Sequence, residues 1–188
     1  MKNRMIFLAG FSGSGKSTIG PPLARKLGRK FVDLDELIAR DAGCSIESIF
    51  ARKNGEEMFR RLETKAIRKT VENRRKGKIV ALGGGAFVSP VNRSLIADFG
   101  LSIYLSCSRL EIYRRLSMAS DRPLLNVRPK KGQTIRQARI IAIGRLLDRR
   151  KKSYRLADVT LSVTNRTVNQ CLSEIVRILE KRDADGQS

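Results

Sequence analysis

The chain has 188 residues, of which 41% are hydrophobic and 30% charged, a balance typical of one soluble globular domain. No apolar run approaches the roughly 18 residues of a membrane helix, and the N-terminus does not resemble a signal peptide, so we expect a cytoplasmic protein without membrane contact. Histidine is absent and the three cysteines form no CxxC pair, which argues against a disulfide framework, a Cys/His zinc site and a histidine-activated nucleophile.

The formal net charge is +21, and its densest part lies late in the chain. Between Arg128 and Arg155 there are eleven Lys or Arg residues against one acid, Asp148. Such an excess is typical of contact with polyanions, but aromatic residues that could stack on bases are almost absent from this stretch. We therefore expect weak, salt-sensitive attraction to polyanions and no specific nucleic-acid partner.

Strand-like and helix-like patterns alternate along the chain, which predicts βαβ units and a parallel sheet. The predicted strands are residues 5–9, 30–34, 78–82, 101–105 and 159–163. The predicted helices are residues 16–27, 34–40, 45–53, 56–75, 90–98, 109–117, 134–152 and 168–181.

Three further features bear on this organisation. Pro21 and Pro22 fall inside the first predicted helix, where they remove two backbone donors, so we expect a kink or an early break there. Residues 119–132 contain prolines and several charges and are predicted to form a mobile lid. Residues 1–181 are expected to form one domain, and residues 182–188 a flexible tail.

The earliest motif is a phosphate loop, which follows the first predicted strand directly. It reads Gly10-Phe11-Ser12-Gly13-Ser14-Gly15-Lys16-Ser17-Thr18. Backbone N–H groups of such a loop point at the β-phosphate, and its glycines allow the backbone to approach closely. The lysine reaches the β- and γ-phosphates, and the following serine hydroxyl suits Mg²⁺. We predict a nucleoside triphosphate site formed by Gly13, Ser14, Gly15, Lys16, Ser17 and Thr18.

Two acids, Asp33 and Asp35, follow the second predicted strand. In open α/β sheets the ligand crevice lies beyond the carboxyl ends of the strands. One carboxylate can help to bind Mg²⁺, and the other can accept a hydrogen bond from an acceptor hydroxyl. An equal alternative is that the two acids only mark the end of a strand and the start of a helix, with Asp35 as the helix cap. The third predicted strand carries no acid for a metal, which makes Asp33 the stronger metal candidate.

Further motifs follow along the chain. Gly83-Gly84-Gly85 comes after the third predicted strand, where backbone N–H groups can approach an anion or polar ligand; a flexible turn is the alternative. Arg60 lies near the start of a predicted helix and, taken alone, is typical of a surface charge. Arg122 lies in the predicted lid, where an arginine can reach the charge that develops on a γ-phosphate after closure.

The order of these parts resembles the shikimate kinase family. The resemblance runs through the phosphate loop, F-x-D-x-D, G-E-x-x-F-R-x-x-E, G-G-G, R-P-L-L and a late R-x-x-x-Y followed by Ala-Asp, and covers residues 5 to 165. It implies a single-domain α/β phosphate-loop kinase fold with a five-stranded parallel sheet in the order 2-3-1-4-5. The implied reaction is transfer of the γ-phosphate of ATP to the 3-hydroxyl of shikimate, in chorismate and aromatic amino acid biosynthesis. A monomer that uses Mg²⁺ is expected.

On the nucleotide side, the resemblance implies that Lys16 holds phosphates, Ser17 ligates Mg²⁺ and Asp33 supports the metal. Arg122 is then the lid arginine, which contacts ATP and acts in catalysis together with Lys16. Contacts to the adenine stay open between candidates such as Arg115 and Arg166.

On the acceptor side, the resemblance implies that Asp35 meets the shikimate hydroxyls and is the candidate base. Arg60 and Arg150 bind the carboxylate, and Gly83, Gly84 and Gly85 line the same site, because a small hydroxylated acid needs a guanidinium fork and a hydroxyl acceptor. Arg149 stands beside Arg150 in the sequence, and Arg150 is preferred only because it lies four residues before Tyr154.

Two other functions stay open. A kinase of another small hydroxy acid, such as gluconate, would need the same phosphate loop, but the paired aspartates with Arg60 and the glycine triplet favour shikimate. A nucleic-acid-associated NTP-binding protein would agree with the positive charge. It should hydrolyse NTP in response to nucleic acid and use no small acceptor.

Overall fold

The computed structural model describes residues 4–72, 77–118 and 127–185. Its strands form one parallel sheet in the order β2-β3-β1-β4-β5, so the predicted fold class and strand order are confirmed. The strands are Met5–Ala9 (β1), Lys30–Asp33 (β2), Lys78–Ala81 (β3), Gly100–Ser106 (β4) and Val159–Ser162 (β5). None of the described helices is long and apolar enough to cross a membrane.

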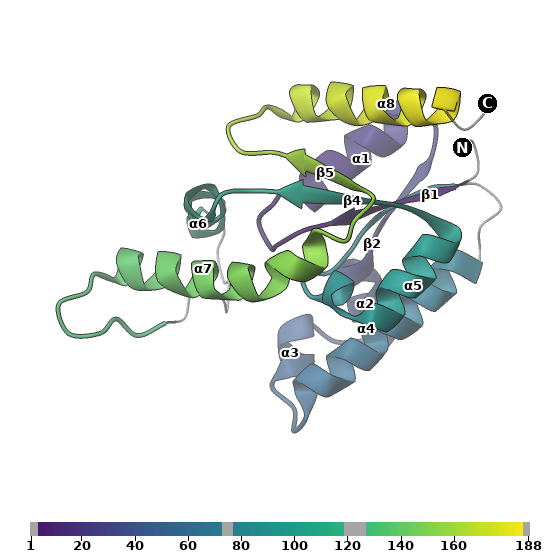
Figure 1. The fold of residues 1–188 in the computed structure, drawn as a ribbon. Helices are drawn as coiled ribbons and strands as arrows, with labels where there is room; N and C mark the ends of the chain where they lie inside the picture. Colours follow the sequence, from purple (N-terminus) through teal and green to yellow (C-terminus); the bar gives the residue numbers. More distant parts are fainter. Residues whose placement is uncertain (1–3, 73–76, 119–126, 186–188) are drawn as a thin grey trace.

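Helices cover both faces of this sheet. Figure 1 shows α1 and α8 on one face, α4 and α5 on the other, and α6 and α7 near the carboxyl ends of the strands. The helices are Lys16–Lys26 (α1), Leu34–Ala42 (α2), Ile46–Phe50 (α3), Gly55–Glu72 (α4), Pro90–Phe99 (α5), Arg109–Ser117 (α6), Ile135–Tyr154 (α7) and Val168–Asp185 (α8), with a short 3-10 helix at Ala86–Val88 (η1).

The central strand β1 shows why the pattern forms this fold. All five of its side chains are buried, because β3 and β4 flank it and helices lie above and below. A parallel strand covered on both faces has no solvent side, so its sequence is a continuous apolar run. The same burial continues into Phe11 in the following loop, which anchors that loop to the core.

The predicted break at Pro21 and Pro22 is wrong, because α1 runs through both prolines to Lys26. Packing of one side of the helix outweighs the lost donors: Leu23 is fully buried, and Gly20 lies directly against the Phe31 ring. A Cβ at position 20 would overlap that ring, so this glycine allows the helix to approach the sheet.

The predicted tail also begins too early. Helix α8 continues to Asp185, and Arg182 donates a hydrogen bond of 2.9 Å to the Asp158 carbonyl, which ties this last turn to the body of the protein. The rest of the predicted tail, residues 186–188, lies outside the described residues, as do residues 119–126 of the predicted lid. The lid itself therefore stays a prediction.

Candidate active site

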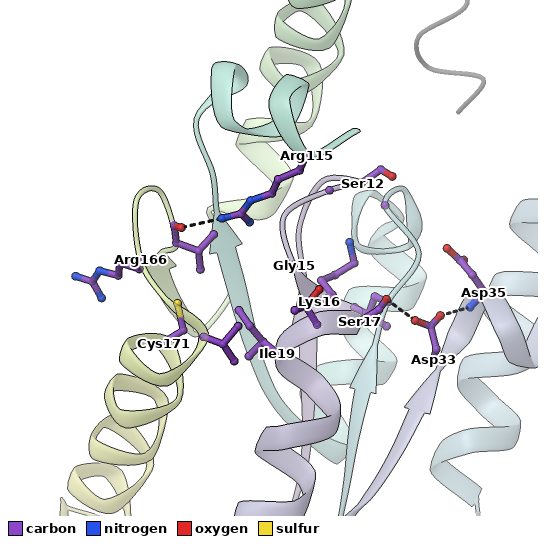
Figure 2. Close-up of a pocket in the computed structure, with 16 residues that line it drawn as sticks. Ser12, Gly15, Lys16, Ser17, Ile19, Asp33, Asp35, Arg115, Arg166 and Cys171 are labelled. Carbon is purple, nitrogen blue, oxygen red and sulfur yellow. Dashed lines mark hydrogen bonds between the residues drawn. The ribbon is translucent and has the colours of Figure 1, made fainter. Parts of the chain in front are cut away.

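The carboxyl ends of three neighbouring strands carry the predicted motifs. Strand β3 lies between β1 and β2, so the phosphate loop after β1, the aspartates after β2 and the glycines after β3 meet at one edge of the sheet. A pocket of about 510 Å³ opens there, and its lining includes the phosphate loop, both aspartates and Gly84. We call this cavity the larger pocket (Figure 2).

The phosphate loop has the backbone that an anion site requires. Gly13 and Gly15 have φ angles of 81° and 99°, in the left-handed region that favours glycine. Gly15 also precedes α1 without providing a side-chain cap, and the first turn of α1 contains no acid. The helix N-terminus therefore offers uncapped N–H groups and partial positive charge to a phosphate.

Lys16 lies across this loop rather than extending into solvent. Its Nζ donates hydrogen bonds of 2.9 Å and 3.0 Å to the carbonyls of Gly10 and Phe11, and the residue is only 8% exposed. Figure 2 shows the ammonium group facing the larger pocket beside Gly15. The charge that the motif predicts for phosphate binding is therefore held inside the loop.

Asp33 joins the phosphate loop to the second strand. The Ser17 hydroxyl donates a 2.6 Å hydrogen bond to Asp33 Oδ2, and Asp33 Oδ1 accepts from the Asp35 backbone N–H at 3.0 Å, which caps α2 (Figure 2). Asp33 is therefore the N-cap of α2, and the alternative expected from the sequence, in which Asp35 is the cap, is wrong. Mg²⁺ prefers oxygen ligands and commonly keeps one or two protein ligands beside phosphates and waters, so Ser17 and Asp33 fit such an ion. The described residues contain no cluster of three or more His, Cys, Asp or Glu that could hold a metal without a nucleotide.

Asp35 faces a second acid, Glu63, across Gly83. A Cβ built on Gly83 would lie 2.6 Å from Asp35 Oδ1 and 2.6 Å from Glu63 Oε1, so only glycine leaves room for both carboxyl groups. Glu63 is 0% exposed. Burial raises the pKa of the Glu63 carboxyl, the nearby Asp35 carboxylate raises it further, and Arg60 opposes both effects.

Glu63 holds Arg60, which explains how a residue that looks like a surface charge becomes part of a site. Arg60 Nη1 donates to Glu63 Oε2 at 2.6 Å, and its Nη2 lies 3.4 Å from Glu56 Oε1. Glu63 belongs to the G-E-x-x-F-R-x-x-E motif, but no role was predicted for it from the sequence. Its position three residues after Arg60, on the same face of α4, was the available signal.

Arg60 also lines a second, smaller pocket of about 420 Å³, together with Gly85, Arg149 and Arg150. A Cβ on Gly85 would overlap the Arg60 guanidinium group, so the last glycine of the triplet makes space for this side chain. The guanidinium groups of these three arginines, beside Gly85, form a cationic site suited to a small carboxylate.

Arg150 and Tyr154 converge on one carbonyl group. Arg150 Nη1 donates to the Gly84 carbonyl at 2.9 Å, and the Tyr154 hydroxyl donates to the same oxygen at 2.5 Å. Tyr154 is fully buried, and burial raises its pKa to about 12. Arg150, rather than the exposed Arg149, therefore contacts the glycine triplet, although both line the smaller pocket.

The far end of the larger pocket is formed by Arg115 and Arg166, the two candidates for the adenine side, together with Cys171. Arg115 Nε donates to Glu111 at 2.8 Å, and its two Nη groups contact the carbonyls of Ser14 and Val163 at 3.3 Å and 3.4 Å. These bonds link α6 to the phosphate loop and to β5, as Figure 2 shows in part. Arg122, the predicted lid arginine, lies outside the described residues.

Comparison with known proteins gives the same family. A model of the family described as shikimate kinase matches residues 12–180. The chain belongs to the shikimate kinase family. Relatives named shikimate kinase include one from Chlorobium chlorochromatii, 43% identical with 94% of this chain and 91% of the relative covered, and one from Geobacter sulfurreducens, 40% identical with 95% and 92% covered.

Solved structures of the family resemble this one closely. A shikimate kinase from Acinetobacter baumannii in complex with shikimate has a TM-score of 0.83 and 30% identity over 95% of this chain and 94% of that one. The enzyme from Aquifex aeolicus has a TM-score of 0.76 and 27% identity, with 96% and 98% covered. A gluconokinase from Sinorhizobium meliloti, at 14% identity and a TM-score of 0.57, shares the fold alone.

Proposed function

We propose that this chain transfers the γ-phosphoryl group of ATP to the 3-hydroxyl of shikimate, in the route to chorismate and aromatic amino acids. One observation carries the proposal: the phosphate loop and the side chains of Asp35, Arg60 and Arg150, which we propose as the acceptor site, line two pockets that meet at residues 83–85, after β3. Membership of the shikimate kinase family, and the shikimate bound to the Acinetobacter baumannii relative, support this choice of acceptor.

The donor half of the site binds the triphosphate. Backbone N–H groups of the loop and of the first turn of α1 hold the β-phosphate, and Lys16 exchanges its two loop carbonyls for β- and γ-phosphate oxygens. Mg²⁺ would be held by Ser17 and supported by Asp33, and would neutralise charge on the phosphates. Arg122, from the predicted lid, is proposed to add a further positive charge.

The acceptor half positions the hydroxyl for attack. Arg60 and Arg150 bind the shikimate carboxylate, and residues 83–85 line the ring's site. Asp35 accepts a hydrogen bond from the 3-hydroxyl and takes its proton as the new O–P bond forms. The bond between the γ-phosphorus and the β–γ bridging oxygen breaks, and ADP leaves with those electrons. Positioning and electrostatic stabilisation supply most of the catalysis in such transfers.

The experiment that tests the proposal is a coupled ADP-release assay with shikimate, gluconate, nucleoside monophosphates or RNA as the acceptor. We expect ADP release with shikimate only, and we expect it to require Mg²⁺. In Lys16→Ala this activity should collapse, while the circular dichroism spectrum should show that the fold is retained. Turnover with gluconate, or ADP release that needs RNA and no small acceptor, would replace this proposal. Size-exclusion chromatography and cell fractionation test the expected cytoplasmic monomer.

A further inference from the structure

Cations and acids are unevenly matched over the surface. Some exposed cations lie beside acids, as in the pairs Arg61–Glu57, Lys69–Asp41, Arg114–Glu111 and Arg177–Glu174. Others, such as Arg25, Arg52 and Arg68, form no ion pair with another described residue. Helix α7 carries five cations of this second kind close together. Its exposed cations Arg145, Arg149, Lys151, Lys152 and Arg155 form no ion pair with any other described residue, and Asp148 is the single acid among them. We call these five residues the α7 cationic face.

The five cations are exposed along the C-terminal half of α7. At 3.6 residues per turn, Arg145 and Lys152 are almost in line, Arg149 and Arg155 lie on either side of that line, and Lys151 lies about 100° around the helix from Lys152. The opposite side is turned to the protein, where Ile143 and Tyr154 are buried. At 1.5 Å per residue, the face from position 145 to position 155 is about 15 Å long.

More positive charge continues along the same direction. Arg128, Lys130, Lys131 and Arg136 are exposed in the segment before α7 and in its first turn. Figure 1 shows α7 lying along the outside of the molecule, with its N-terminal half and residues 127–134 projecting beyond the sheet.

We propose that the α7 cationic face binds the phosphate backbone of double-stranded nucleic acid without sequence preference. A duplex carries one negative charge per about 1.7 Å of its axis with both strands counted, so a 15 Å length holds about nine phosphate charges, of which those on the near side can meet the face. Arginine guanidinium groups also match phosphate geometry well. The charge of this face, uncompensated by acids, is complementary to such a partner.

The composition of the face favours a duplex over other polyanions. It contains no aromatic side chain, so it offers no stacking platform for the bases of a single strand. A helix that binds at a membrane surface needs a free apolar face, whereas Ile143 and Tyr154 of α7 are buried, and Ile141 and Leu156 are exposed only as single apolar residues among the cations. Arg150, which contacts Gly84, lies on another side of the helix. Arg149 also lines the smaller pocket and is therefore not substituted in the test, so that duplex binding and the proposed kinase activity can be measured separately.

The test compares two variants that remove the same amount of charge. The first is Arg145→Gln, Lys151→Gln, Lys152→Gln and Arg155→Gln on α7. The matched control is Arg61→Gln, Lys65→Gln, Arg68→Gln and Lys69→Gln on α4, where two of the cations are ion-paired. Binding of two unrelated 30-base-pair DNA duplexes is measured by fluorescence anisotropy between 50 and 300 mM salt, for the wild-type chain and both variants.

We expect the α7 variant to lose at least tenfold in duplex affinity. The slope of log affinity against log salt concentration should become smaller by about 3–4, because four phosphate contacts are removed and each contributes about 0.9. The control should keep the wild-type slope, and both duplexes should give the same result. Kinase activity should be unchanged in the α7 variant, which shows that it folds.

The proposal is overturned by an equal loss in the control, which would mean diffuse attraction to the whole molecule, or by unchanged binding in the α7 variant. Stronger binding to vesicles of anionic lipid or to polyglutamate than to the duplex would assign the face to a membrane or an acidic protein instead. Absence of shikimate turnover in the wild-type chain would refute the proposed function and leave this inference standing.

Discussion

Gly85→Ala should separate acceptor binding from nucleotide binding. The φ angle of Gly85 is −110°, which alanine adopts without strain, so the backbone should tolerate the change. The added methyl carbon would lie 2.6 Å from Arg60 Cζ and 2.7 Å from Arg60 Nη2, well inside van der Waals contact. The guanidinium group must therefore shift from its position in the smaller pocket.

The magnitude follows from the lost contact. A hydrogen bond to a charged group contributes about 1.5–3 kcal/mol, which corresponds to a rise of about 10- to 150-fold in KM for shikimate. The assay is initial rates with shikimate and ATP varied in turn, and the KM for ATP should change little. A double variant with Arg60→Ala should be no worse than Arg60→Ala alone, because the methyl group acts through that side chain.

Gly144→Ala is the matched control. Its Cβ would come no closer than 3.5 Å to Arg109, which is ordinary contact, and Gly144 lies inside α7. Alanine should therefore stabilise the protein by about 0.5–1 kcal/mol and leave both KM values unchanged. A wild-type KM for shikimate in Gly85→Ala, or additive effects with Arg60→Ala, would refute the reasoning.

Tyr154→Phe removes one of the two donors to the Gly84 carbonyl. It should lower the free energy of unfolding, measured by urea titration, by about 0.5–1.5 kcal/mol. An unchanged free energy would mean that the hydrogen bond from Arg150 alone is sufficient for this oxygen. In the folded state the pKa of Glu63 is raised above its usual 4.5, so just above that pH the native chain binds more protons than the unfolded chain. The protonated Glu63 carboxyl therefore stabilises the folded state at low pH, and this stabilisation is lost as the pH rises through the raised pKa. The melting temperature of the wild type relative to Glu63→Gln should accordingly fall as pH increases above about 4.5, and a gap that is flat or widens contradicts the assignment. Asp33→Asn should raise the Mg²⁺ requirement, with partial rescue by excess metal, whereas Asp35→Asn should keep normal Mg²⁺ dependence and lose about 10²–10⁴-fold in turnover if it is the base. Indistinguishable Mg²⁺ titrations would count against this division of roles.

Several features of this protein followed from the sequence because their causes are local. The phosphate loop depends on glycines within nine consecutive residues and on the helix start that follows, so its backbone was predictable from those residues alone. The strand order followed from a family resemblance distributed over the chain and agrees with the buried apolar runs of β1 and β3.

Tertiary structure decided the rest, because packing between distant segments sets those contacts. Local chemistry favoured a break in α1 at its prolines, but the burial of Leu23 against the core keeps the helix whole. The four-residue distance from Tyr154 was the one local reason to prefer Arg150 to Arg149, and the orientation of α7 over Gly84 decides between them. Likewise, Glu63 and Asp35 lie on different helices and become neighbours only where Gly83 leaves space for both carboxyl groups, so their shared environment exists only in the folded chain.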